Sequence, residues 1–296
     1  MESAFRAHAP EELTRTTLRR LGEGIGKVVY ASEHWVVKRQ RTSWEMVALI
    51  VLWRVVRKGE RYLPGGLGER LLAKPSRQIR FLRVMIQGLM RVLPMSVWLT
   101  THVREVWRVY RSRDIQGERV AAEYLVGTNL MPRTIRFPPA RVRVNGWPGE
   151  LTVTEATERV EATLHQRLAE LAAAGRFKEV GHWLERFLQL RQSGWRRGVF
   201  SLDAHLKNYG VSGERIVLLD AGGLTDRWEE VEGKLELEEV VAQPHIQLGL
   251  GDVLGGRPDL ARRFDERWKA IVSRASVEEH WPAEPDSDVT SSLSAD

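Results

Sequence analysis

Alternating apolar and polar positions predict β-structure at both ends of the first half of the chain. After a short helix at Glu11–Arg20, the glycine-containing run Leu21–Tyr30 predicts a strand, a turn and a second strand. His34–Lys38 favours a third strand. Arg133–Val144 and Glu150–Thr154 predict a further pair joined by a turn. We therefore expect a small β-rich lobe in the N-terminal half.

Helical spacing dominates the rest of the chain. Ser43–Val56 and Gln78–Tyr110 are rich in Trp, Leu, Val and Arg and are predicted to be helices, the second with loosely helical spacing of its apolar residues, and Glu118–Val126 is predicted to be a further short helix. Two amphipathic helices are predicted at Glu158–Ala173 and Phe177–Gln192. The second has an apolar face formed by Val180, Trp183, Leu184, Phe187, Leu188 and Leu190.

The order of these elements predicts an α+β protein with two lobes. Residues 1–154 would form the N-terminal β-rich lobe, with a helical insertion at 41–117, and residues 155–275 a mostly helical C-terminal lobe. Residues 276–296 form an acidic tail that contains serine and proline, so we expect this tail to be disordered.

Composition limits the chemistry and the location. The 296 residues include no cysteine, which excludes disulfides, thiolate catalysis and cysteine-ligated zinc. Met1–Pro10 lacks the apolar core of a secretory signal, and no apolar run reaches the roughly 18 residues needed to span a membrane. We therefore expect a cytoplasmic protein.

The positive charge is concentrated in the predicted insertion. Arg41–Gly117 contains 15 lysines and arginines and five acidic residues, a balance of +10, which leaves −4 for the rest of a chain whose net charge is +6. Arginines such as Arg80 and Arg108 alternate with apolar residues such as Phe81 and Trp107, as in interfacial helices. This segment either contacts an anionic membrane surface or glycolipid, or packs on its own domain. We do not expect nucleic acid as a partner, because the sequence shows no helix-turn-helix or RNA-binding signature.

Three polar residues near the C-terminal third carry the strongest chemical signal. Asp203 and Asn208 are five positions apart, and Asp220 ends the predicted strand Arg215–Leu219 and precedes Ala221-Gly222. Phosphoryl transfer needs a carboxylate that orients the acceptor hydroxyl and oxygen ligands that hold magnesium against phosphates. These residue types at this spacing fit that chemistry.

The two motifs resemble the protein-kinase-like superfamily. Its catalytic loop contains Asp-x-x-x-x-Asn, and its metal loop begins Asp-Phe-Gly, here with alanine for phenylalanine. The resemblance implies a two-lobed kinase-like fold, ATP and Mg²⁺ as cofactors, Asp203 as catalytic base, and Asn208 and Asp220 as metal ligands.

The N-terminal half is similar to the same family. Gly22, Gly24 and Gly26 resemble its glycine-rich phosphate loop with one residue fewer before the third glycine, and Lys38 resembles its phosphate-binding lysine. Glycines let backbone N–H groups approach phosphate oxygens. Glu155 falls where the family's hinge meets adenine.

The resemblance also implies a helix glutamate that pairs with Lys38. Glu123 is our first candidate because of its distance from the following strand, with Glu118 second and Glu45 third.

His205, two positions after Asp203, resembles the catalytic loop of small-molecule and antibiotic phosphotransferases, and no Ala-Pro-Glu motif follows Gly222. We therefore expect a kinase that acts on a hydroxyl acceptor such as a membrane-associated glycan or glycolipid, as lipopolysaccharide-core sugar kinases do. It would be peripheral on the inner membrane. The alternatives are a protein Ser/Thr kinase and a pseudokinase that binds nucleotide without transfer.

Overall fold

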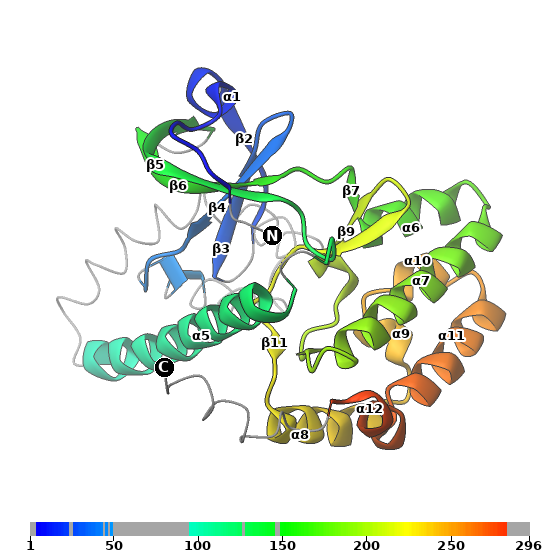
Figure 1. Cartoon of the computed structure of the whole chain (residues 1–296). Helices are drawn as coiled ribbons and strands as arrows, with labels where there is room; N and C mark the ends of the chain where they lie inside the picture. The colour runs from blue at the N-terminus through cyan, green and yellow to red at the C-terminus, as the bar shows by residue number, and fades with distance from the viewer. Residues whose placement is uncertain are drawn as a thin grey trace, which may run out of the picture. The chain divides into compact units, whose positions relative to one another are not determined.

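The structure, a computed structural model, divides the chain into two compact units (Figure 1). The strand unit comprises Ser3–Arg113 and Arg133–Arg159, and the helical unit comprises Asp114–Pro132 and the chain from Val160 onward. The residues that the structure describes are 4–23, 26–43, 45–46, 48–49, 95–125, 128–145 and 149–282.

The strand unit is built on one six-stranded sheet. Its order is β1-β5-β2-β3-β4-β6, and β5 also pairs with β6, so five of the strands close into a ring of pairings. The elements are β1 (Ala4–Phe5), α1 (Glu11–Arg15), β2 (Thr17–Glu23), β3 (Lys27–Ala31), β4 (Trp35–Gln40), β5 (Thr134–Val144) and β6 (Glu150–Glu158).

Alternation along β5 and β6 explains why these segments form strands. Leu151 and Val153 are buried in β6 between exposed neighbours, because successive side chains of a strand point to opposite faces. In β5 the register shifts between Arg136 and Ala140, where two prolines lack the N–H that a ladder needs. The buried side chains of the five strands form one core.

Helix α5 (Met95–Tyr124) is a continuous helix of 30 residues. It corrects our expectation of separate helices at Gln78–Tyr110 and Glu118–Val126. The chain passes from the strand unit to the helical unit after Arg113, within this helix. Most of the predicted insertion before Met95, including Arg80, lies outside the described residues.

The helical unit contains a small three-stranded sheet of order β10-β9-β7, a two-stranded sheet of β11 and β8, and several helices (Figure 1). Its elements are β7 (Ala162–Thr163), α6 (Leu164–Ala173), α7 (Phe177–Trp195), β8 (Phe200–Ser201), η1 (Leu206–Asn208), β9 (Tyr209–Ser212), β10 (Arg215–Leu218), β11 (Leu224–Thr225), α8 (Trp228–Glu239), α9 (Pro244–Gln247), α10 (Gly251–Leu254), α11 (Pro258–Ile271) and α12 (Arg274–His280).

Helix α7 is the centre of this unit's core. Its predicted apolar face is buried, apart from Leu190, which is partly buried. The same face buries Arg191, whose guanidinium lies 4.8 Å from the centre of the Phe200 ring and donates to the carbonyl oxygen of Ser201 at 3.1 Å. Arg191 thus connects the core to the strand that leads into Asp203.

The mixed α+β class is confirmed, but several boundaries differ from our predictions. The first helix ends at Arg15, because Thr17 already pairs with Arg143 in the sheet. Helix α6 starts at Leu164, where Thr163 and Gln166 form a capping box, and not at Glu158.

The limits of the lobes also shift. Residues 114–132, assigned to the N-terminal lobe, belong to the helical unit, and the strand unit extends to Arg159 instead of Thr154. Residues from Ser276 to His280, expected in a disordered tail, belong to α12, and Val277 is fully buried. Residues 283–296 lie outside the described part. Within the described residues, no helix has the length and apolar character needed to cross a membrane.

Candidate active site

Asp203 lies on the loop between β8 and the short helix η1. Its carboxylate is exposed, and Oδ1 accepts a hydrogen bond from the His205 N–H at 3.3 Å. Its backbone oxygen accepts from Ser201 Oγ at 3.0 Å and from Asn208 Nδ2 at 3.3 Å. These two bonds hold the loop by its backbone, so the Asp203 carboxylate itself remains exposed to solvent.

Asp220 lies on a second loop, between β10 and β11. It is partly buried, and its Oδ1 accepts from the Gly222 N–H at 3.1 Å. Strand β10 reaches this loop because Ile216, Val217 and Leu218 are buried, which anchors the strand in the core. Asp220 therefore lies at the point where the buried strand ends and the chain becomes more exposed.

The two loops are joined by backbone hydrogen bonds. Leu202 N–H donates to the Gly223 oxygen at 2.7 Å, and Leu219 N–H donates to the Asn208 oxygen at 2.8 Å. Strands β8 and β11 pair directly beside them. The structure thus brings together Asp203, Asn208 and Asp220, which we had singled out from sequence.

His205 supports the Asp203 loop. Its Nδ1 accepts from the Lys207 N–H at 3.2 Å, so the proton of a neutral ring sits on Nε2. Burial and then the charge of Lys207 lower the pKa of His205, which favours that neutral form. The ring packs directly on Gly249, which has a φ of +84° and no room for a Cβ on that side. His205 thus supports the Asp203 loop through its Nδ1 hydrogen bond and its contact with Gly249.

The C-terminal half of α5 packs on the Asp220 loop. A Cβ at Gly117 would overlap the carbonyl oxygen of Ala221, and a Cβ at Gly222 would overlap the carboxylate of Asp114. At Gly117 only glycine permits this approach, because the neighbouring atom belongs to the backbone, whereas at Gly222 the Asp114 side chain would have to move. The position of the loop is therefore set by a helix about one hundred residues earlier in the chain.

An ion-pair network holds the same helix from its other side. Arg119 donates to both carboxylate oxygens of Asp226, at 2.7 and 3.0 Å, and pairs with Glu123 at 2.7 Å. Glu123, our first candidate for the lysine partner, thus has Arg119 as its partner within the helical unit. Glu118 lies four residues after Asp114, on the face that contacts the Asp220 loop.

The remaining predicted residues lie in the strand unit. Lys38 is exposed on β4 and is paired in register with Val29. Gly22 and Gly26 flank the β2–β3 turn, with open space where a side chain would be. Gly24 lies outside the described residues. The proximity of these residues to Asp203 stays a prediction.

Two acidic candidates of the strand unit already have partners. Glu45, our third choice for the lysine partner, forms two hydrogen bonds with Arg39 at 2.7 and 2.9 Å. Burial opposes its ionisation, but these bonds outweigh burial and lower the pKa of Glu45. Glu155 lies inside β6, opposite Arg136 at 3.7 Å, and the strand continues to Glu158. The connection between units therefore begins after the position we expected for the hinge.

Sequence reasoning missed Gly117, Arg119, Asp226 and Arg191. A glycine within a helical pattern and a charged residue on an apolar helix face were the available signals. In the described part of the chain, no group of three or more histidine or acidic side chains is placed to hold a metal by itself.

Comparison of the chain with protein-family models, with curated proteins and with solved structures finds no match.

Proposed function

We propose that the chain transfers the γ-phosphate of ATP to a hydroxyl acceptor in a magnesium-dependent reaction. The observation that carries this proposal is the joining of the Asp203 loop to the Asp220 loop by hydrogen bonds within one unit. A base and two oxygen ligands of the kind that phosphoryl transfer uses thus lie on adjacent loops.

The donor set of these loops suits magnesium. Asp220 offers carboxylate oxygens and Asn208 an amide oxygen, and the ion typically takes only one or two carboxylates from the protein and further oxygens from phosphates and water. Bound magnesium and nucleotide would supply the transferable phosphoryl group and balance its negative charge.

Asp203 is proposed to accept the proton of the acceptor hydroxyl. Its Oδ2 makes no hydrogen bond to another described residue, while Asn208 Nδ2 and Ser201 Oγ hold the backbone of its loop. A carboxylate that is exposed on a fixed loop can receive a proton from a bound substrate.

Lys38 and the glycines Gly22, Gly24 and Gly26 are proposed to bind the phosphates, and Glu155 to lie near adenine, on the basis of the sequence resemblance. On the same basis Glu123, with Glu118 second, is proposed as the helix glutamate that pairs with Lys38. A pseudokinase is disfavoured because the positions of the base and of both metal ligands are filled.

The acceptor is proposed to be a glycan or glycolipid at an anionic membrane surface. The support is the exposed part of α5 in the strand unit, where Val106, Val109 and Tyr110 are between 42% and 48% exposed. Arg108 and Arg111 are exposed beside them. Apolar side chains flanked by arginines are typical of an interfacial helix.

Purified protein should consume ATP only with magnesium and an acceptor. We expect transfer of labelled γ-phosphate to a membrane glycolipid fraction, with none after chelation of magnesium. Transfer to a protein fraction instead would identify a protein kinase. Binding of Mg·ATP without transfer to any fraction would indicate a nucleotide-binding scaffold, and no binding at all would overturn the proposal.

Charge reversal on α5 should weaken membrane binding. Each basic residue near an anionic surface contributes about 1 kcal/mol, so Arg108→Glu with Arg111→Glu should reduce the affinity for phosphatidylserine vesicles by about 30-fold or more. Vesicle co-sedimentation at low salt measures this. The control, Arg196→Glu with Arg262→Glu, changes the same charge at exposed positions of the helical unit. An equal loss in both pairs, or no binding of the unmodified chain, would contradict the membrane assignment.

A further inference from the structure

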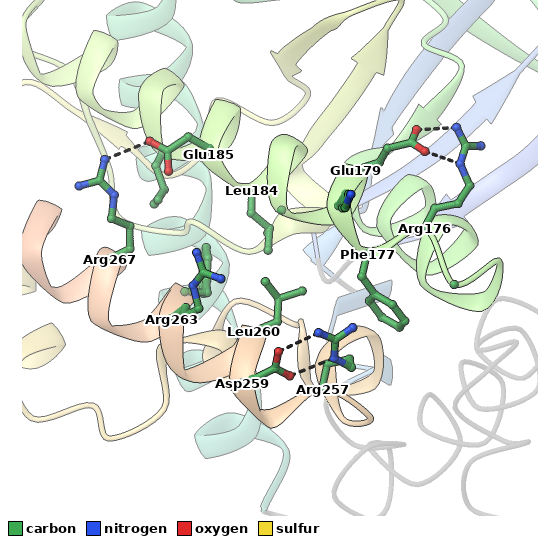
Figure 2. A pocket seen from close by; sticks show the side chains of 15 residues that line it. Arg176, Phe177, Glu179, Leu184, Glu185, Arg257, Asp259, Leu260, Arg263 and Arg267 are labelled. Atoms are coloured by element: carbon green, nitrogen blue, oxygen red, sulfur yellow. Dashed lines mark hydrogen bonds and ion pairs between the residues drawn. The ribbon is translucent and has the colours of Figure 1, made fainter.

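A groove lies between α7 and α11 of the helical unit, and it shares no residue with the candidate active site (Figure 2). Its volume is about 910 Å³, at the upper end of the roughly 300–1,000 Å³ of ligand pockets. Leu184 and Leu260 lie near its middle, and Phe177 lies toward one end. The floor is therefore apolar and reaches along both helices.

Cationic groups follow the groove along its length. Arg176 pairs with Glu179, Arg257 with Asp259 and Arg267 with Glu185. Arg263 and Lys178 also line the groove. Neither forms an ion pair or hydrogen bond with another described residue, and Figure 2 draws none at Arg263.

The spread of basic residues along the groove indicates which class of ligand would bind there. A single-chain lipid has one anionic head, which would use the positive charge at one end only. The lining contains five basic and three acidic residues, spread from Arg176 to Arg267. A peptide with several carboxylates and a few apolar side chains complements such a groove along its whole length.

The chain itself contains a peptide of this composition. Residues 283–296 include no lysine or arginine, four acidic residues (Glu284, Asp286, Asp288 and Asp296) and the apolar Val289 and Leu293. This segment follows Pro282, whose ring packs on Gly198, just beyond the end of α7.

The distance also allows contact. On α7 the groove extends from Phe177 to Leu188. At a rise of 1.5 Å per helical residue, Leu188 lies about 15 Å and Phe177 about 30 Å from Gly198. Fourteen extended residues span up to about 46 Å. The segment can therefore reach both ends of the groove.

We propose that the groove between α7 and α11 is the docking site of the chain's own acidic segment, residues 283–296. Its carboxylates meet Arg263 and Lys178, and its apolar side chains lie on the leucine floor. This assignment does not depend on the proposed phosphotransfer.

Disulfide trapping tests the proposal in the full chain, which has no cysteine of its own. Gly181 also lines the groove and has open space for a side chain, so Gly181→Cys keeps both cations; combined with Leu293→Cys it should form an intramolecular disulfide under mild oxidation. The control combines Leu293→Cys with Gln189→Cys, which is exposed on another face of α7 and lies closer along the helix to Pro282. A segment that does not dock would react at Gln189→Cys at least as fast. We expect the Gly181→Cys pair to react at least about fivefold faster.

Charge reversal supplies the second arm. In the Gly181→Cys, Leu293→Cys protein, Arg263→Glu should slow the reaction about fivefold or more, and added salt should slow it as well. Arg262→Glu, the same charge change on an exposed neighbour outside the groove, should leave the rate unchanged. Equal rates for the two cysteine pairs, equal effects of the two reversals, or disulfides formed only between molecules would each overturn the assignment.

Discussion

Replacing Asp220 with alanine is expected to abolish phosphoryl transfer and to weaken the binding of Mg·ATP. Loss of a residue that only supports a metal ligand typically costs about 10–100-fold, so loss of the ligand itself should cost more than about a hundredfold. The measurements are turnover with labelled ATP and calorimetric titration with Mg·ATP.

Two control variants distinguish loss of metal binding by Asp220 from disruption of the loop that contains it. Asp220→Asn keeps an oxygen that can accept from the Gly222 N–H but removes the charge, so it should bind Mg·ATP poorly while unfolding at a similar temperature. Glu214→Ala removes an exposed carboxylate from the turn before β10 and should leave turnover unchanged. Unchanged turnover in Asp220→Ala would refute the metal-site assignment.

Asp203→Asn is expected to reduce turnover by about a hundredfold or more while the affinity for ATP stays nearly unchanged. A positioned base typically contributes about 10²–10⁴-fold to a rate. The asparagine can still accept from the His205 N–H, and the bonds to the Asp203 backbone are unaffected, so the loop should keep its conformation. Turnover and the Kd for Mg·ATP, measured on the same preparation, test both halves of this prediction.

Ser201→Ala is the matched control for the Asp203 loop. It removes the hydroxyl that donates to the Asp203 carbonyl and leaves the carboxylate in place. We expect a smaller effect, below about tenfold, because only the support of the loop is lost. A near-normal rate in Asp203→Asn would favour the nucleotide-binding scaffold, whereas joint loss of ATP binding would make Asp203 a structural residue.

The spacing of apolar residues along the sequence predicted those strands and helices whose buried side chains recur with one regular period. The strands near Arg133–Val144 and Glu150–Thr154 and the apolar face of α7 have side chains that alternate or recur with one period, and burial follows the same positions. The residues of the two loops were found from their types and spacing. Their hydrogen bonds could not be predicted, because they join segments that are distant in sequence.

Helix α5 shows why other features were missed. Two separate helices were expected, ending at Tyr110 and beginning at Glu118, and Gly117 between them disfavours a helix by about 1 kcal/mol relative to alanine. In the structure the helix continues, because the missing side chain lets the backbone approach Ala221. Arg191 was missed for a similar reason, since a charged residue becomes compatible with burial only when aromatic rings and a carbonyl oxygen surround it.

The interleaving of the two units has a consequence for synthesis on the ribosome. The strand unit can complete its sheet once Glu158 has left the ribosome. Asp114–Tyr124 belongs to the other unit, and its packing partners Ala221 and Asp226 have not yet been synthesised at that point. At about 5–20 residues per second, the hundred or so intervening residues take roughly 5–20 s to make. During that interval the apolar side chains of Val120 and Ala121 lack the core that later buries them. The nascent chain therefore exposes this half-helix to chaperones and proteases before its packing partners exist.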